Sequence, residues 1–226
     1  MMGFFSKKKH LELPGFWETY TNHFRDKLPE TISENTFVVL DTETTGFNMT
    51  KDRMLCIGAL KLRDNTMVVK ESFEVYVEQE HYDAESAEIH GILKKSKKER
   101  VTELEALQQF LAYAKNHVLV GHHVLFDVGM INAALRRNGL PQLLNKTLDT
   151  GLLYKRTLLI SSVLRKKENY SLDELAEKFR ISKKDRHTAL GDTLITAIAF
   201  LAIMEKLKPK NLKDLFKKQN PPKFGL

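Results

Sequence analysis

Apolar and polar positions follow two different periods along this chain, and the change of period predicts where strands give way to helices. Apolar runs at residues 37–40, 55–62 and 66–77 predict three strands before residue 100. The short segment Arg63-Asp64-Asn65 joins the second run to the third. A connection of that length predicts a hairpin, so we expect these two strands to pair antiparallel.

From residue 101 onward apolar residues recur every three to four positions, which is the period of an α-helix. This pattern predicts helices at residues 102–115, 124–138, 151–160, 171–179 and 188–207. Two short apolar segments, "HVLV" at 117–120 and "KTLDT" at 146–150, predict strands between them. A meander of strands followed by alternating helices and strands predicts an α/β fold, with a mixed sheet of about five strands flanked by helices.

Several local signals support these helix boundaries. Asn138-Gly139 is typical of a helix end. Ser171 and Glu174 form the sequence pattern of a capping box, which marks a helix start. Asp149 precedes the predicted helix at 151–160, and we expect it to cap that helix rather than to bind a metal.

The same pattern divides the chain into an extension, a domain and a tail. Residues 1–35 contain apolar side chains at helical spacing, namely Phe16, Trp17, Tyr20, Phe24 and Leu28. We expect this helical extension to pack on the domain, although a partner-binding helix is the alternative. The domain itself is predicted over residues 36–207. The basic, proline-containing tail at 208–226 is expected to be loosely ordered.

The charge of the chain predicts a class of partner. The 226 residues carry a net charge of +7, and 42% of them are hydrophobic, enough for a sizeable core. Basic residues cluster at several places, which favours nucleic acid as the partner over a merely solvated basic surface. The single cysteine, Cys56, lies in an apolar run, as is typical of a reducing cytoplasm. No stretch approaches the ~18 apolar residues of a membrane span, so a cytoplasmic location without membrane insertion is expected.

Candidate chemistry begins at the end of the first strand, in "FVVLDTETTGF" at residues 37–47. Asp41 and Glu43 fall on the same face of a strand, and two such charges repel each other unless a cation lies between them. Either this is a solvated strand end or it binds a cation. Two more acidic residues follow apolar segments: Asp127, and Asp192 in the last helix with His187 ahead of it. A carboxylate that points inward from a packed helix needs compensation.

These residues form three motifs that resemble the exonuclease motifs of the DEDDh family, the family of the proofreading epsilon subunit of bacterial DNA polymerase III. The motifs are "DTETTG" at 41–46, "GHHVLFD" at 121–127 and "HTALGD" at 187–192. One such motif occurs often by chance, whereas three in order, each in the expected setting, are specific. The resemblance covers residues 37–207. It implies a ribonuclease-H-like fold, 3′-to-5′ exonuclease activity and two divalent metal ions.

The resemblance also implies roles for the motif residues: Asp41, Glu43, Asp127 and Asp192 as metal ligands, and His187 as general base. Carboxylates are the ligands that Mg²⁺ and Mn²⁺ prefer, and two such ions can hold the attacking and leaving oxygens of a phosphodiester. Histidine can accept a proton near neutral pH. The simpler alternatives are helix N-terminal charges for Asp127 and Asp192, and a surface cap for His187.

Residues beside the motifs are candidate substrate contacts, and these are Thr42, Thr44, Thr45, Gly46, Phe47, His90, His122, His123 and Phe126. His90 belongs to "EIHGI" at 88–92, which resembles a family segment near the substrate's 3′ end. The residues at 44–46 either contact the terminal nucleotide or shape a turn. The two phenylalanines either stack on bases or pack in the core.

One motif position departs from the family. The family commonly has asparagine where this chain has His123, and an imidazole replaces only part of the hydrogen bonding of an amide. A zinc site at His122-His123 is disfavoured, because acidic ligands are available and no cysteine lies nearby.

The sequence therefore predicts a metal-dependent 3′-to-5′ exonuclease that acts on single-stranded or frayed DNA ends and releases nucleoside 5′-monophosphates, in proofreading or repair. One alternative is an RNA exonuclease of the same superfamily, similar to ribonuclease T or oligoribonuclease, since the motifs do not separate DNA from RNA. The other is a non-catalytic subunit that binds nucleic acid or a polymerase. A DNA polymerase or sliding clamp is a candidate partner: "LKDLF" at 212–216 faintly resembles a clamp-binding peptide without its leading glutamine, and a short helix explains it equally well.

Overall fold

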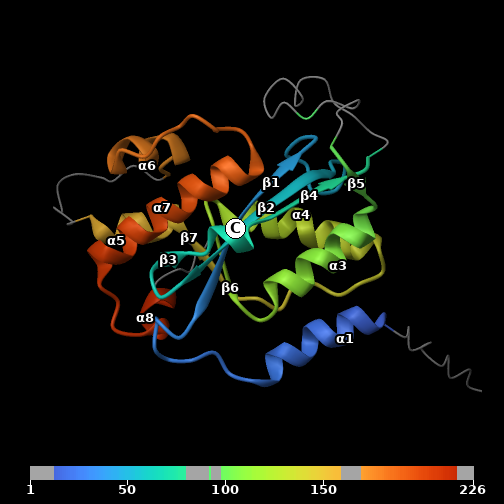
Figure 1. Ribbon diagram of the computed structural model, residues 1–226, viewed down its shortest axis with the longest axis horizontal. Helices are drawn as coiled ribbons and strands as arrows, with labels where there is room; N and C mark the ends of the chain where they lie inside the picture. The colour runs from blue at the N-terminus through green and yellow to red at the C-terminus, as the bar shows by residue number, and fades with distance from the viewer. Residues whose placement is uncertain (1–12, 80–91, 93–97, 159–168, 218–226) are drawn as a thin grey trace, which may run out of the picture.

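A mixed β-sheet forms the centre of the computed structural model, which describes residues 13–79, 92, 98–158 and 169–217 (Figure 1). The described residues form a seven-stranded sheet in the order β5-β4-β2-β1-β6-β7, with β3 paired to β2 outside this path. The strands are β1 (Thr36–Thr44), β2 (Met54–Arg63), β3 (Thr66–Met67), β4 (Phe73–Val77), β5 (Arg100–Val101), β6 (Val118–Gly121) and β7 (Thr147–Asp149). The predicted fold class, a mixed sheet flanked by helices, is confirmed.

Helices cover both faces of this sheet. One face carries α1 (Gly15–Asn22), α3 (Glu103–Ala114) and α4 (Val124–Arg137), and the other carries α5 (Thr150–Thr157), α6 (Leu172–Phe179), α7 (Ala189–Leu207) and α8 (Leu212–Phe216) (Figure 1). Strand β1 is buried on both sides. Its Val38 and Leu40 belong to the core under α4, and its Phe37 and Val39 belong to the core under α7, as the period of two in a strand requires.

The sheet changes direction at β1. This strand pairs antiparallel with β2 and parallel with β6, and β6 pairs parallel with β7. The carboxyl ends of β1, β6 and β7 therefore meet at one edge of the sheet. In open α/β sheets, ligands commonly bind in the crevice outside the carboxyl ends of the strands, and the acidic end of β1 lies at that edge.

The predicted local signals are confirmed. Asp64 and Asn65 both have positive φ, 46° and 56°, which is the conformation of a two-residue hairpin turn. Ser171 and Glu174 make both hydrogen bonds of the capping box at the start of α6. The extension packs on the domain: Trp17 and Tyr20 of α1 are buried in the core under α4, and the Tyr20 hydroxyl donates to Asn145 Oδ1 at 2.6 Å.

One predicted strand is wrong, and one strand was missed. Residues 66–77 are not one strand, because a 3-10 turn at Val69–Glu71 separates β3 from β4. This turn is held by the Tyr113 hydroxyl, which donates to the Glu71 carbonyl at 2.7 Å, and by the Arg63 guanidinium, which donates to the Glu71 carboxylate at 2.7 Å. These contacts are distant in sequence or lie on a neighbouring strand, so the apolar pattern does not reveal them. Strand β5, paired parallel to β4, is too short to show a period.

The tail is not loosely ordered over residues 212–216. It forms α8, capped by the Asn211 side chain, with Leu212 and Leu215 buried against the domain. The short-helix interpretation of "LKDLF" is therefore confirmed. Residues 218–226 lie outside the described part. Within the described residues, no helix has the length and apolar character needed to cross a membrane.

Candidate active site

A pocket of about 550 Å³ opens where β1 ends, and it brings the three sequence motifs together. Its walls come from the end of β1 and the loop after it, the start of α4, the start of α6 and the turn before α7. The motif residues that line it are Asp41, Thr42, Glu43, Thr44, Gly46, Phe47, His122, His123, Phe126, Asp127, His187 and Asp192. His90 lies outside the described residues.

Three carboxylates meet at the bottom of this pocket. Asp41, Glu43 and Asp192 each offer an oxygen, and these oxygens lie within 4.8 Å of one another. The odd-numbered residues of β1 face the layer that contains α7, so strand alternation directs Asp41 and Glu43 toward the first turn of that helix. Asp192 is the acidic residue of that turn. The cluster therefore joins a strand to a helix 150 residues later in the chain.

Asp127 approaches from the opposite face of the sheet. It lies in the first turn of α4, is buried, and accepts hydrogen bonds from the backbone nitrogen of Thr42 at 2.9 Å and from its hydroxyl at 2.7 Å. Thr42 is the residue of β1 that faces this layer, between the two carboxylates that face the other. Asp127 is thus fixed beside the acidic cluster, and it adds to the negative charge of the pocket.

The pKa values of these groups are raised first by burial and then by the negative charge around them. Burial, followed by the charges of Asp192 and Asp127, raises the pKa of Glu43 to about 7. Burial raises the pKa of Asp127 to about 7 against the opposing effect of the Thr42 hydrogen bonds. The pKa of Asp41 is raised well above its usual range by burial and then by its acidic neighbours. Such a set of carboxylates is stabilised by bound cations.

The three histidines of the motifs differ in their surroundings. His187 is exposed at the pocket and has a φ of 64°, and its backbone N–H donates a hydrogen bond to Asp192 Oδ1 at 3.3 Å. His122 lies deeper, with Nδ1 2.9 Å from the Thr150 hydroxyl at the start of α5. Burial lowers the pKa of His122 to about 4, so its ring is neutral at neutral pH. His123 has a φ of 59° and lies against His122, with ring centroids 4.5 Å apart.

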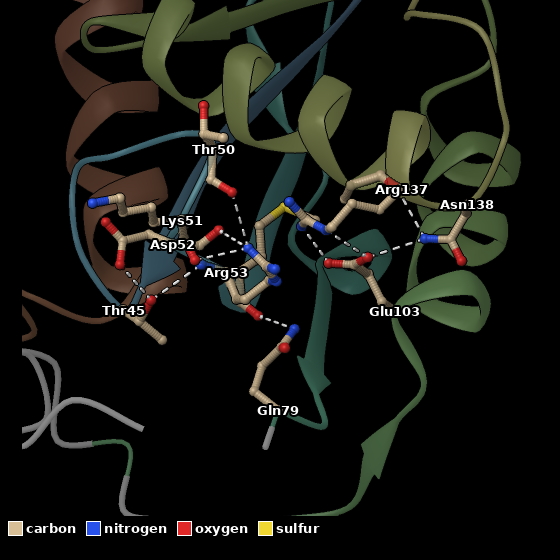
Figure 2. Close-up of polar contacts among 11 residues, drawn as sticks. Thr45, Thr50, Lys51, Asp52, Arg53, Gln79, Glu103, Arg137 and Asn138 are labelled. Atoms are coloured by element: carbon tan, nitrogen blue, oxygen red, sulfur yellow. Dashed lines mark hydrogen bonds and ion pairs between the residues drawn. The ribbon is translucent and has the colours of Figure 1, made fainter. Parts of the chain in front are cut away.

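The loop that follows β1 is held by its own polar contacts (Figure 2). The Thr45 hydroxyl donates to Asp52 Oδ1 at 2.9 Å, and Asp52 Oδ2 accepts from the Asn48 nitrogen at 2.7 Å. Arg53 Nη1 donates to the carbonyl oxygens of residues 50–52 at 3.3, 2.8 and 3.0 Å. A side chain at Gly46 would begin 2.6 Å from the Asp52 carboxylate. These contacts hold the loop in a turn, and a contact of residues 44–46 with the terminal nucleotide stays a prediction.

This loop presents an aromatic ring at the pocket. Phe47 is 86% exposed, so core packing is wrong for this residue. Its ring centroid lies 5.8 Å from that of the half-buried Phe126 on α4. The Met49 side chain lies so close to Gly129 of α4 that a Cβ there would be 2.5 Å from its sulfur. The loop thus rests on α4 and leaves one face of Phe47 open.

Asp149 caps α5, as expected. Its Oδ1 accepts from the Leu152 nitrogen at 3.0 Å and its Oδ2 from the Val124 nitrogen at 3.1 Å. One carboxylate therefore ties the start of α5 to the start of α4, beside the pocket rather than in its acidic cluster.

With this geometry described, comparison with known proteins identifies the family. A model of the RNase T family, described as exonuclease, matches residues 38–200. The chain belongs to this exonuclease family. The match spans all three motifs, whose residues line the pocket.

Relatives of this exonuclease domain include parts of replication proteins. A DNA polymerase III PolC-type protein of Thermotoga petrophila is 31% identical over 185 residues, which are 82% of this chain and 13% of that relative. A DNA polymerase III subunit epsilon-like protein of Rhodobacter capsulatus is 36% identical over 182 residues, which are 78% of this chain and 25% of that relative. The chain thus spans a quarter or less of the length of these two relatives.

Solved structures confirm the fold at lower sequence identity. Exonuclease I of E. coli, in complex with a dT13 oligonucleotide, has a TM-score of 0.64 at 17% identity, over 77% of this chain and 42% of that one. Exonuclease X in complex with 5′ overhanging duplex DNA has a TM-score of 0.56 at 20% identity, over 75% of this chain and 91% of that one. This exonuclease domain shares their architecture.

The donor set of the pocket fits the divalent ions that such exonucleases use. Among the described residues, Glu43 Oε1 is buried without a hydrogen-bond partner, as a ligand atom aimed at a cation would be. The other donors of the cluster are also carboxylate oxygens, which suit hard cations such as Mg²⁺ and Mn²⁺.

Sequence reasoning missed a glycine that sets the position of α7. Gly58 of β2 lies opposite Asp41 in the β1–β2 ladder. A Cβ at this position would lie 2.5 Å from the carbonyl carbon of Ala189 and 2.7 Å from the nitrogen of Leu190. The Thr193 hydroxyl donates to the Gly58 carbonyl at 3.1 Å. The available signal was a glycine inside an apolar strand, which marks a close backbone approach.

Sequence reasoning also missed Arg186, which it counted only as one residue of a basic cluster. Its guanidinium lines the pocket and donates to Asp192 Oδ2 at 2.5 Å. The charge of Arg186 lowers the pKa of Asp41 and of Glu43, against the stronger effects that raise them. No pattern in the sequence distinguishes this arginine from its basic neighbours.

Proposed function

We propose that this chain is a metal-dependent 3′-to-5′ exonuclease that removes nucleoside 5′-monophosphates from single-stranded or frayed DNA ends. The observation that carries the proposal is the meeting of Asp41, Glu43 and Asp192 within 4.8 Å at the edge of the sheet, in a chain whose family is one of exonucleases. Asp127 lines the same pocket. These four carboxylates are the proposed ligands of two Mg²⁺ or Mn²⁺ ions.

Each part of the pocket has a task in this reaction. The ions, when bound, offset the charge that develops on the phosphate and lower the pKa of the attacking water. His187, exposed at the pocket beside Asp192, accepts the proton of that water as general base. The open face of Phe47 stacks on a base near the 3′ end, with Phe126 supporting it. The backbone of residues 44–46 lies along the same wall and positions the terminal nucleotide.

DNA is the proposed substrate for two reasons. The relatives named above are DNA polymerase III proteins, and the two solved structures hold DNA. The net charge of +7 suits a polyanion of either kind. Proofreading or repair beside a DNA polymerase, in the cytoplasm, is the setting that these relatives favour.

The test is degradation of a 5′-labelled single-stranded DNA oligonucleotide with Mg²⁺, Mn²⁺ or EDTA. The wild type should give a ladder that shortens from the 3′ end, and EDTA should stop it. Asp41→Asn should lower the rate by ~10²-fold or more, because a metal ligand is lost. Asp64→Asn, which removes a carboxylate from the exposed hairpin turn, is the matched control and should leave the rate unchanged.

Wild-type activity of the Asp41→Asn variant, or degradation that continues in EDTA, would refute the proposal. A matched RNA oligonucleotide tests the substrate class. Faster degradation of RNA than of DNA would replace DNA with RNA as the substrate and leave the assignment of the ligands unchanged.

A further inference from the structure

We propose that Arg186 is a positioning residue that serves as the counter-ion of Asp192 and couples cation binding to the binding of a substrate phosphate. The inference rests on the proposed function, because it concerns the same carboxylates. Arg186 belongs to the turn that joins α6 to α7, and its guanidinium reaches into the wall of the acidic pocket.

The guanidinium connects two carboxylates with different surroundings. Nη1 donates to Asp192 Oδ2 at 2.5 Å, whereas Nε and Nη2 donate to Asp173 Oδ1 and Oδ2 of α6 at 2.9 and 3.3 Å. The side chain of Asp192 is 9% exposed and that of Asp173 is 45% exposed. The Arg186 side chain is 18% exposed. It therefore has one buried contact in the pocket, with Asp192, and an anchor of two hydrogen bonds to the more exposed Asp173.

Arg186 and a divalent cation make opposing demands on Asp192. Oδ1 of Asp192 accepts from the His187 nitrogen at 3.3 Å and Oδ2 accepts from Arg186, while the same carboxylate supplies an oxygen to the acidic cluster. A cation in that cluster competes with the Arg186 guanidinium for the lone pairs of the Asp192 carboxylate, and the two positive charges repel each other. The contact between Arg186 and Asp192 therefore weakens cation binding, and a bound cation weakens that contact.

The anchor on Asp173 keeps the guanidinium at the pocket after Nη1 leaves Asp192. Two of its nitrogens already donate to Asp173, so the side chain need not move into solvent. Two divalent cations balance four carboxylates, which leaves the negative charge of a phosphodiester without a partner. A planar guanidinium is a favourable partner for a phosphate oxygen. A phosphate thus gives Nη1 a new acceptor and lowers the penalty for cation binding.

The coupling predicts opposite effects on two ligands in the Arg186→Met variant. Mn²⁺ alone, titrated at pH 8 by calorimetry and by the electron paramagnetic resonance of free Mn²⁺, should bind ~10-fold more tightly than to the wild type. Thymidine 5′-monophosphate, titrated with Mn²⁺ saturating, should bind ~10-fold more weakly. Both changes lie within the usual range of coupling between two ligands. Arg186→Lys keeps the charge and should restore the wild-type Mn²⁺ affinity.

Two further variants separate this coupling from general effects. Lys183→Met removes a positive charge from the same turn, where Lys183 pairs with the exposed Glu177, and should change either affinity by less than twofold. Asp173→Asn removes the anchor but keeps the guanidinium, so Mn²⁺ alone should bind no more tightly than to the wild type. If Arg186→Met does not fold by circular dichroism, Arg186→Gln provides the same measurements with a neutral polar side chain.

Weaker or unchanged Mn²⁺ binding in Arg186→Met, or in Arg186→Gln where that variant replaces it, would overturn the inference, since it would mean that the arginine only orients Asp192. Unchanged nucleotide binding would overturn it as well. Neither result affects the proposed function, which fails instead if the wild-type protein binds no Mn²⁺ and degrades no DNA.

Discussion

Gly58 shows how a missing side chain can set the distance between two functional groups. It lies opposite Asp41 on the neighbouring strand, and the backbone of residues 189–190 occupies the space that a Cβ would need. Because Asp192 follows in the first turn of α7, the approach of this helix to β2 fixes the separation of Asp41 and Asp192.

The substitution Gly58→Ala should therefore impair both stability and catalysis. Its methyl group meets backbone atoms, which cannot rotate away, so α7 must shift and carry Asp192 with it. We expect a loss of ~1–3 kcal/mol in the free energy of unfolding, as for other overpacked sites, and a fall of ~10-fold or more in the exonuclease rate, since small misplacements at a reacting centre have large effects.

Urea unfolding and oligonucleotide degradation measure the two effects. Gly15→Ala is the matched control, because nothing lies within 4 Å of the added methyl group. A Gly58→Ala protein with the wild-type rate would show that the position of α7 does not depend on this contact.

The motif carboxylates could be found from the sequence because their chemistry is local in the chain: each follows an apolar segment that delivers it to the edge of the sheet. Arg186 and Gly58 could not be assigned a place in the pocket, since their roles depend on residues that only folding brings near. Arg186 donates to Asp173, 13 residues earlier in the chain. Gly58 contacts the backbone of a helix that begins more than 130 residues later. The metal, base and substrate roles of the motif residues stay predictions.

The loop between β1 and β2 is held by side-chain contacts. It carries the exposed Phe47, and its carbonyl oxygens at residues 50–52 accept hydrogen bonds from Arg53 (Figure 2). A loop held in this way keeps the aromatic ring in place before substrate arrives, so less ordering entropy is lost on binding.

Replacing Arg53 with alanine should weaken substrate binding without affecting the chemical step. We expect KM for a single-stranded oligonucleotide to rise ~3–10-fold while kcat stays within twofold, the pattern of a lost binding contribution that is equal in ground and transition states. Steady-state kinetics measure both constants.

The control is Arg63→Ala, which removes an exposed arginine of β2 from its ion pair with Glu71 of the 3-10 turn. It should leave KM unchanged. A large fall in kcat for Arg53→Ala, with KM unaltered, would mean that the loop takes part in the reaction rather than in binding.

The long elements were predictable from the sequence, as were the short strands β6 and β7, whereas β5 was not. The helices α3, α4 and α7 each span three or more turns, so their period is visible, and their predicted bounds agree with the structure to within one residue. Strand β5 has two residues and α8 has five, and each is defined by a neighbour rather than by its own pattern. The interruption of residues 66–77 likewise depends on Tyr113 in α3.

At the scale of the whole molecule, the stability of the fold should depend on a half-buried histidine, His117. Burial, followed by the charges of Lys61 and Lys115, lowers the pKa of His117 to about 4. In the unfolded chain histidine binds a proton near pH ~6.5. Between these values the unfolded state holds more protons than the folded state, so stability falls as the pH falls from about 6.5 to 4.

His117→Gln should remove this part of the pH dependence. The melting temperature of the variant, relative to that of the wild type, should rise by a few degrees as the pH falls from 6.5 to 4, and should not change between pH 7 and 8. Thermal unfolding across this range measures the difference. A constant difference at all pH values would show that His117 titrates alike in both states.

The whole architecture was predictable because its causes repeat along the chain: a double-sided apolar pattern in the strands and one apolar face per helix. The packing of the two ends was only partly predictable. The docking of α1 follows from its aromatic face, whereas the contact of the Leu212 nitrogen with the Glu30 carbonyl at 2.8 Å joins segments that show no pattern in common.

Asp127 comes from the layer on one side of the sheet and Asp192 from the layer on the other. Cations that neutralise both carboxylates would therefore also link the two helical layers across the strand β1 between them. Local opening of either layer should abolish activity before the protein unfolds globally. Ions bound between the layers should slow digestion by proteases.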